Sequence, residues 1–392
     1  MAAYYNVFGS NSIDLAILPA SYAAYVRGTN ANRNAQSAGA VLDAAADANQ
    51  LGTDNTTQSQ LLALLSSLNG SQMQAMTTAL AGEIHGALAA AAPQGGQTLQ
   101  NTVAGQLGGA YFKDVNDPAR DQALWADLTG SRARWSADKV ASGFTANHTQ
   151  LSIGADILRT AGSRVGVGVS HSTTNVSAAG GSGSVEENMA FVYGEHSIGG
   201  LVLDGLAAYG RSSWDSRRGD PLGLAGTLGN SVHGNSALVS AGISLPHQVN
   251  NMLLAPYARL MWQQTKRDGF AENSATPAAL TLSDYSAAGT RAIAGVMAGS
   301  LDKNPLIADY TYRYGAAVGV DGGNLIRASA DATLASNKTT IGSTDVGRAF
   351  VQINLNGTAR MGKNAYSFIG LTGEARSGKT DVGINIGARA VF

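Results

Sequence analysis

The sequence predicts an all-β membrane protein: a 12-stranded antiparallel transmembrane β-barrel with an N-terminal α-helical segment, the last helix of which threads the barrel lumen. Three observations predict this fold class. Apolar residues recur with a period of two from Leu124 to the end of the chain. They recur with a helical period between about residues 32 and 110, and the connections between the predicted strands alternate between short and long.

The composition fits this class. The chain has 392 residues and a net charge of −1, so no basic surface indicates a nucleic-acid partner. Charged residues make up 14% of the chain, whereas about 25% is typical of soluble domains. Cysteine is absent, which excludes a disulfide framework and a thiolate metal site and fits an oxidising envelope compartment. No apolar run approaches the roughly 18 residues of a membrane-spanning helix.

The first ten residues, MAAYYNVFGS, do not form a secretory signal peptide, because they lack a charged region followed by an apolar one. We therefore expect an export signal, and more of the protein, upstream of Met1.

Residues 32–96 are expected to be helical. Asn69-Gly70 predicts the end of one helix, and Ser71 is expected to cap the next. The apolar residues at helical spacing are Val41, Leu42, Ala45, Leu61, Leu62, Leu64, Leu65, Leu68, Met73, Met76, Leu80, Ile84 and Leu88.

A last, slim helix is predicted over residues 97–109. Its apolar residues Leu99, Val103 and Leu107 follow a strict four-residue step, and the rest of its surface, Asn101 included, is small or polar. So thin an apolar stripe is poorly suited to a hydrophobic core. A helix is about 10–12 Å across, and a barrel of eight strands is already filled by its own side chains. Twelve strands should leave room for one slim helix in the lumen.

Twelve strands are predicted after this helix. They span residues 123–136, 145–159, 163–176, 185–197, 200–212, 231–246, 252–267, 286–301, 307–321, 346–361, 364–376 and 379–392. The last strand shows the alternation best, with Val382, Ile384, Ile386, Ala388 and Ala390 on one face. Strands of nine or more residues with one apolar face match a tilted crossing of a bilayer. The opposite faces should point into the lumen, which predicts as lumen residues Asp156, Gln352, Asn354, Arg360, Asn385 and Arg389.

The predicted connections are short on one side of the sheet and long on the other, except that the final hairpin (377–378) is short on the long side. The long ones cover residues 178–187, 213–230, 266–285 and about 322–345, and the last of these is hard to parse. Residues 322–335 could extend the hairpin of the ninth strand, residues 307–321, above the membrane. An even number of strands puts both barrel ends on the side of the short turns, which in outer-membrane barrels faces the periplasm.

The barrel must close on itself, because every backbone N–H and C=O group in lipid needs a partner within the protein. We therefore expect the first strand to pair with the last, which ends at Phe392. Aromatic residues within the strands are interpreted as an interface girdle. These residues are Trp125, Trp135, Tyr193, Tyr209, Tyr257, Trp262, Tyr310, Tyr312 and Tyr366.

Over residues 30–392 the chain resembles the translocator domain of the autotransporters, the type V secretion family. The segments that carry the resemblance are NRNAQSAGAVLDAAAD (32–47), LAGEIHGAL (80–88), ALWADLTGSRARW (123–135), GADI (154–157), APYARLMW (255–262) and INIGARAVF (384–392). SNSIDLAIL (10–18) is similar to the tail of a passenger domain. The resemblance implies four regions: a passenger tail and linker (1–31), a helical linker (32–96), a pore helix (97–109) and the barrel (123–392).

The resemblance also implies a function. The barrel would export and anchor an N-terminal passenger, and its own helix would close the pore afterwards. The expected partners are outer-membrane lipid and lipopolysaccharide, the barrel assembly machinery, periplasmic chaperones and the passenger itself, with the protein monomeric and without a cofactor or metal. Phe392, Ala390, Ile386 and Ile384 resemble the family's C-terminal insertion signal.

The sequence favours no enzyme. Glu83 and His85 are two residues apart on a predicted helix and face different sides. The histidines show no metal-ligand spacing, and no P-loop or nucleophile elbow occurs. One reaction stays open from the resemblance: some members cleave their passenger autocatalytically at an asparagine of the pore helix. Asn101 is the candidate here, with Asp127, Asp156 or Asp204 as the assisting acid.

Three alternatives remain. The chain could be an outer-membrane channel for small solutes with a plug, or an adhesin whose long loops bind host surfaces. It could also be a soluble protein with a helical domain and a β-sandwich. The helical region 32–110 argues against a simple channel, which has no use for it.

Overall fold

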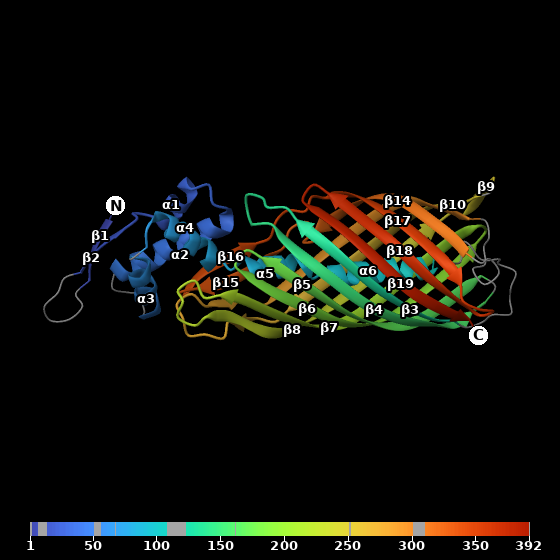
Figure 1. Cartoon of the computed structure of the whole chain (residues 1–392), viewed down its shortest axis with the longest axis horizontal. Helices are drawn as coiled ribbons and strands as arrows, with labels where there is room; N and C mark the ends of the chain where they lie inside the picture. Colours follow the sequence, from blue (N-terminus) through green and yellow to red (C-terminus); the bar gives the residue numbers. More distant parts are fainter. Residues whose placement is uncertain are drawn as a thin grey trace.

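The computed structural model describes residues 2–6, 14–50, 56–66, 68–107, 123–160, 162–250, 252–300 and 310–391. Within these residues the chain forms a closed barrel of twelve antiparallel strands. Helices fill part of the barrel and others stand at one of its ends (Figure 1). The predicted fold class is confirmed.

The barrel strands follow the predicted order with small shifts of their ends. They are β3 (Ala123–Trp135), β4 (Phe144–Arg159), β5 (Ser163–Ala178), β6 (Gly181–Ile198), β7 (Leu201–Gly219), β8 (Thr227–Ser244), β10 (Met252–Arg267), β13 (Tyr285–Ser300), β14 (Tyr310–Gly323), β17 (Ala349–Arg360), β18 (Ala365–Arg376) and β19 (Lys379–Val391). Each strand pairs with its neighbours in the chain, and β10 pairs with β13. The ring closes where β19 pairs with β3, from Lys379 opposite Trp135 to Val391 opposite Ala123.

The alternation along the strands separates a lipid face from a lumen face. On β19, Val382, Ile384 and Ile386 point outward and are 66%, 50% and 57% exposed, whereas Arg389 is buried inside. A closed ring leaves no free sheet edge, so apolar side chains can cover its outside while the backbone groups pair within the wall.

The two ends of the barrel differ. One end holds the connections 199–200 and 361–364, the beginning of β3 and the end of β19; we call it the short-turn end. The opposite, long-loop end holds the connections 136–143, 220–226, 268–284 and 324–348. The long loop expected over 178–187 is wrong. β5 and β6 stay paired as far as Ala178 opposite Gly181, and Gly180, with φ +74°, completes a two-residue turn.

Two of the long loops form a second, four-stranded sheet, which we call the loop sheet. It contains β11 (Phe270–Ala271), β12 (Leu280–Leu282), β15 (Ser329–Leu334) and β16 (Asn337–Gly342). The expected extension of the ninth strand's hairpin through residues 322–335 is wrong. The stretch builds a hairpin of its own, β15–β16, which pairs with β12 rather than continuing β14.

Four helices form a cap at the loop sheet: α1 (Tyr22–Gly28), α2 (Arg33–Gln50), α3 (Thr56–Leu65) and α4 (Gly70–Leu80). Of these, α2 packs on β16, and the other three pack on α2. Leu42, Leu61 and Leu65 lie fully buried in one apolar cluster with Leu280 and Leu334 of the loop sheet. A short hairpin of β1 (Ala2–Asn6) and β2 (Asp14–Leu18) precedes them. Figure 1 shows this helical cap at one end of the molecule, opposite the end of β19.

The cap of α4 differs from the expectation. Asn69, not Ser71, accepts a hydrogen bond from the backbone N–H of Gln72 at 3.0 Å. The Gln72 side chain accepts one from the N–H of Asn69 at 2.9 Å, which completes a capping box.

Two further helices enter the barrel from the long-loop end: α5 (Glu83–Ala91) and α6 (Gln94–Leu107). Pro93 separates them. The helical filling therefore begins well before residue 97, and residues 108 and 109 of the predicted pore helix lie outside the described part. None of the helices among the described residues is long and apolar enough to span a membrane.

Candidate functional site in the barrel lumen

The lumen helix α6 lies against one side of the barrel wall. Leu99, Val103 and Leu107, each at most 1% exposed, pack into one apolar cluster with wall residues from β3, β6, β7, β8 and β10. These wall residues are Trp125, Met189, Phe191, Tyr193, Leu206, Ala208, Leu238 and Met261. The expectation that so thin a stripe suits no hydrophobic core is wrong. Because only one side of the helix contacts apolar wall, a thin stripe is enough.

The predicted aromatic girdle is wrong for five of its nine members. Tyr209, Trp262, Tyr310 and Tyr312 are exposed on the outer face. The other five point inward: Trp125, Trp135, Tyr193, Tyr257 and Tyr366. The alternation of side chains along β3 indicates that Trp125 points inward. Trp125 lies on the same face as Asp127 and on the opposite face from Leu124 and Leu128.

Two glycines allow α6 to approach the wall. A Cβ atom on Gly95 would lie 2.5 Å from Oε2 of Glu187, and one on Gly96 would lie 2.6 Å from Nε2 of Gln263. Gln263 also donates a hydrogen bond to the carbonyl of Pro93 at 3.0 Å, at the break between α5 and α6. The start of α6 is therefore fitted to the wall by side-chain size as well as by polarity.

The carboxyl end of α6 is held by arginines. Arg164 donates to the carbonyls of Gln106 at 2.9 Å and Leu107 at 3.2 Å, which belong to the last described turn of the helix. A cation at this end also interacts favourably with the helix dipole. Arg389 donates to Oε1 of Gln106 at 3.3 Å and pairs with Asp156. Asp156 in turn accepts a hydrogen bond from Tyr193 at 2.7 Å.

The other side of the lumen holds a polar crevice of about 180 Å³ beside α6. Asn101 faces this crevice together with Gln352, Asn354, Asp127 and Asn385. Asn385 donates to Asp127 at 2.8 Å, and Thr102 of α6 donates to the same carboxylate at 3.4 Å.

The remaining predicted site residues lie in other places. Asp156 and Arg389 are buried on the apolar side with α6, and Asp204 is paired with Arg259 at 2.8 Å. Arg360 shares the inner parity of β17 but is exposed at the short-turn end. In the C-terminal segment, Ile384, Ile386 and Ala390 point outward, whereas Phe392 lies outside the described residues.

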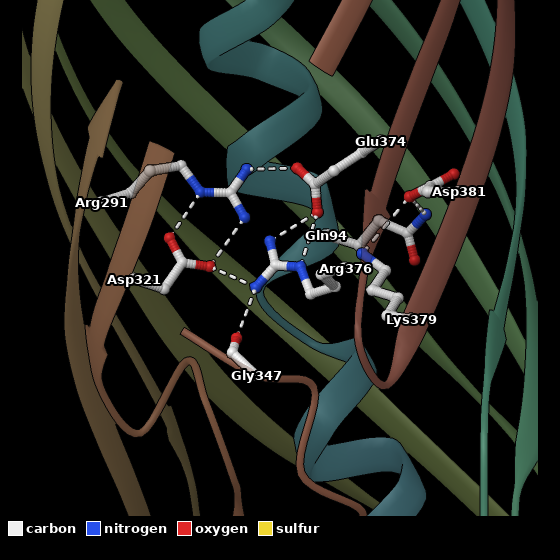
Figure 2. Close-up of polar contacts among 8 residues, drawn as sticks. All are labelled: Gln94, Arg291, Asp321, Gly347, Glu374, Arg376, Lys379 and Asp381. Atoms are coloured by element: carbon white, nitrogen blue, oxygen red, sulfur yellow. Dashed lines mark hydrogen bonds and ion pairs between the residues drawn. The ribbon is translucent and has the colours of Figure 1, made fainter. Parts of the chain in front are cut away.

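Four charged side chains lie together at the end of the crevice that is nearer the long-loop end. We call Arg291, Asp321, Glu374 and Arg376 the ionic layer. Arg291 pairs with Asp321 at 2.9 Å and with Glu374 at 3.0 Å, and Arg376 pairs with Asp321 at 2.7 Å. Figure 2 shows the layer beside the lumen helices, with Gln94 and the pair Lys379–Asp381 next to it. Gln94 donates to Asp381 at 3.1 Å, so α6 is linked to the same polar network.

A second buried polar group connects α5 to the loop sheet. His85 pairs with Glu272 at 3.0 Å, and Glu272 also accepts hydrogen bonds from Arg218 at 2.8 and 2.7 Å. Glu83 points elsewhere and accepts from Asn32 and from the N–H of Ser142. In the part of the chain that the structure describes, no group of three His, Asp or Glu side chains could hold a metal ion.

The fold and the lumen define a class of protein: an outer-membrane barrel whose own N-terminal segment occupies its pore. The family model of the "Autotransporter beta-domain" matches residues 124–372. The chain belongs to the autotransporter family, and its barrel is an outer-membrane translocator domain. Membership implies a passenger domain attached to the barrel. Among curated proteins, none matches the chain.

Solved structures of the same kind share the fold. The translocator domain of autotransporter NalP from Neisseria meningitidis is 15% identical, covers 78% of this chain and 99% of its own, and has a TM-score of 0.61. The β-domain of the Bordetella autotransporter BrkA is 17% identical over 69% of this chain and 100% of its own, with a TM-score of 0.52. The transport unit of AIDA-I from Escherichia coli is 15% identical over 76% and 99%, also with a TM-score of 0.52.

Proposed function

We propose that this barrel exports a passenger through its lumen, anchors it, and is then closed by α6. The short-turn end faces the periplasm of a Gram-negative cell, and the long loops with the helical cap face outward. Insertion then involves the barrel assembly machinery, periplasmic chaperones and the lipopolysaccharide of the outer leaflet, with Phe392 in the C-terminal insertion signal.

One observation carries this proposal: the path of the chain. The helices α1 to α4 stand at the long-loop end, α5 and α6 run through the lumen, and β3 begins at the short-turn end. Whatever precedes α1 is therefore joined to the barrel by a segment that crosses the full length of the pore. This is the arrangement that export through the lumen would leave behind.

The export proposal is tested with an export signal and an epitope fused upstream of Tyr22. In intact cells we expect added protease to remove the epitope while the barrel stays folded. The matched control lacks residues 379–392, so its ring cannot close, and its epitope should not reach the surface. An epitope that stays protected in cells with a folded barrel would contradict export.

Closure by α6 is tested separately by deletion of residues 95–110. The deletion removes the apolar contacts of Leu99, Val103 and Leu107 with the wall, and single-channel conductance in planar bilayers should rise. An unchanged conductance would exclude α6 as the closure.

A second candidate activity is autocatalytic cleavage at Asn101. The side-chain amide nitrogen attacks the residue's own backbone carbonyl carbon, the peptide bond to Thr102 breaks, and the amine of Thr102 leaves while Asn101 becomes a cyclic imide. The observation that favours it is that Asn101 and Asp127 line the same polar crevice. Mass spectrometry of the purified protein decides this point: cleavage yields two fragments, and an intact chain of 40.0 kDa excludes it under the conditions used.

A further inference from the structure

Four charged side chains that pair with one another lie in the part of the lumen that α6 leaves unfilled. We propose that the ionic layer of Arg291, Asp321, Glu374 and Arg376 is a second closure of the pore, which stops small hydrated ions from passing alongside the helix. The inference rests on the proposal that α6 stays in the lumen after export. It adds that side chains of the barrel wall close the space that α6 leaves open.

The need for a second closure follows from the off-centre position of α6. Its buried side chains contact strands from β3 to β10, whereas Gly105 on its opposite side is exposed to the crevice. The crevice runs beside the helix from Tyr366 and Arg313, near the short-turn end, to Glu374 and Asp381. A polar cavity needs only about 10–15 Å³ to hold one water, so a volume of about 180 Å³ holds many.

The ionic layer lies where this space narrows. Beyond it, a small cavity lined by Arg291, Asp321, Arg376 and Lys379 measures only about 20 Å³. That volume accommodates about one water, which is too little for an ion with its hydration shell. The side chains of Arg291, Asp321 and Arg376 are 3%, 1% and 1% exposed, so they pack closely against one another and their surroundings.

The members of the ionic layer come from three nearby strands of the wall. Arg291 belongs to β13, Asp321 to β14, and both Glu374 and Arg376 to β18. The intervening strand β17 contributes Phe350, whose ring lies 4.5 Å from the guanidinium of Arg291 and 4.8 Å from that of Arg376. On β19, Lys379 and Asp381 continue the layer to Gln94 of α6. Through these contacts the charged side chains of the wall meet the helix in the lumen.

The charges of the layer cancel. Two arginines face two carboxylates, so the intact layer attracts neither cations nor anions. A buried ion network is weak evidence for stability, since apolar side chains of similar volume often stabilise a protein as well or better. In this position it has another consequence: it fills the space beside α6 with side chains that are paired with one another.

The test is the ion conductance of the full chain in planar lipid bilayers under a KCl gradient. Arg376→Ala leaves a net negative layer, and Glu374→Ala leaves a net positive one. Both variants should show a several-fold rise in single-channel conductance over the wild type. Their reversal potentials should have opposite signs, with Arg376→Ala favouring cations and Glu374→Ala favouring anions.

Arg259→Ala is the matched control. Arg259 also lines the crevice and pairs with a carboxylate, Asp204 at 2.8 Å, but it lies outside the ionic layer. Its removal should leave the conductance at the wild-type level. Equal opening by Arg259→Ala would overturn the proposal, and so would unchanged conductance in both layer variants or the same selectivity in both.

Removing one partner of a buried ion pair can also prevent folding. Unheated gel electrophoresis shows whether each variant forms a barrel. Where a single variant does not fold, the double variant Glu374→Ala/Arg376→Ala tests the proposal instead. It removes one charge of each sign, so it leaves no net charge in the layer. The double variant should conduct more than the wild type, without a strong preference for cations or anions. Wild-type conductance in the folded double variant would contradict the proposal that the ionic layer closes the pore. Since no passenger is involved, these results are independent of the export test.

Discussion

At the scale of single residues, two glycines of the lumen helices have opposite surroundings. A Cβ atom on Gly86 of α5 would lie 2.8 Å from the backbone carbonyl oxygen of Gly342 in the loop sheet. A Cβ atom on Gly105 of α6 would have open space around it, with no other side chain or strand of the described residues within 4 Å. Close approach of two backbones therefore requires glycine at the first position and not at the second.

These surroundings predict different effects of alanine. Gly86→Ala should weaken the docking of α5 on the loop sheet by about 1–3 kcal/mol, because a backbone must move. Gly105→Ala should be neutral or should stabilise the helix by up to about 1 kcal/mol, because alanine is the better helix former.

Limited proteolysis of the β15–β16 hairpin measures this difference. Cleavage of the hairpin should be faster in Gly86→Ala and unchanged in Gly105→Ala. Equal rates in the two variants would show that the contact with Gly342 does not hold the loop sheet in place.

At the scale of elements, the docking of α5 on the loop sheet should depend on pH. Burial lowers the pKa of His85 below 6.5, and it outweighs the opposing effect of Glu272. Burial alone would raise the pKa of Glu272, but its hydrogen bonds from His85 and Arg218 lower this pKa to about 2. Both groups lie at the level of the loop sheet, with Arg267 as the next charged neighbour.

The sign of each effect follows from which state binds the proton. As the pH falls below 6.5, unfolded His85 takes up a proton before the folded residue does, so docking loses stability. Glu272 stabilises the docked state fully above pH 4.5 and loses this contribution between 4.5 and about 2. Stability should therefore fall in two stages on acidification.

His85→Gln separates the two stages, because glutamine can still donate to Glu272 but does not titrate in this range. Proteolysis of the loop sheet at pH 7 and pH 5 should accelerate on acidification in the wild type and much less in the variant. The same acceleration in both would assign the first stage to another group.

At the scale of the whole molecule, the orientation of the barrel can be read from introduced thiols. The chain contains no cysteine, so a single introduced cysteine is the only thiol. Ala179 lies in a turn at the long-loop end, and Lys363 lies in a turn at the short-turn end; both are exposed.

A membrane-impermeant maleimide added to intact cells should label Ala179→Cys and leave Lys363→Cys unlabelled. After the cells are lysed, both should react, which controls for folding and accessibility. Labelling of Lys363→Cys alone in intact cells would reverse the proposed orientation.

The strands were predictable because their signal is local. Side chains such as Val382, Ile384 and Ile386 reveal an outward face by parity alone, wherever the neighbouring strands lie. The helical region and the slim lumen helix were predictable for the same reason. The ends of the strands were less predictable. β7 continues to Gly219, past the expected residue 212, because its pairing with β6 and β8 continues that far.

The site was only partly predictable. Parity placed Gln352 and Asn385 in the lumen, but it could not show that Asp156 and Arg389 pair on the apolar side of α6. The ionic layer was missed, although Asp321, Glu374 and Arg376 all lie in or near predicted strands. Its members are far apart in the sequence, so only the register of β13 to β18 brings them together.

The sequence by itself determined the number of strands, the face of each strand that meets lipid, and the presence of one helix slim enough for the lumen. These features depend on periods of two and of about four residues, which a bilayer and a helix impose locally. Only the tertiary structure decided which wall α6 contacts, which aromatics turn inward and which charges meet across the crevice. Those depend on closure of the ring and on strand register, which bring residues from distant parts of the chain within bonding distance.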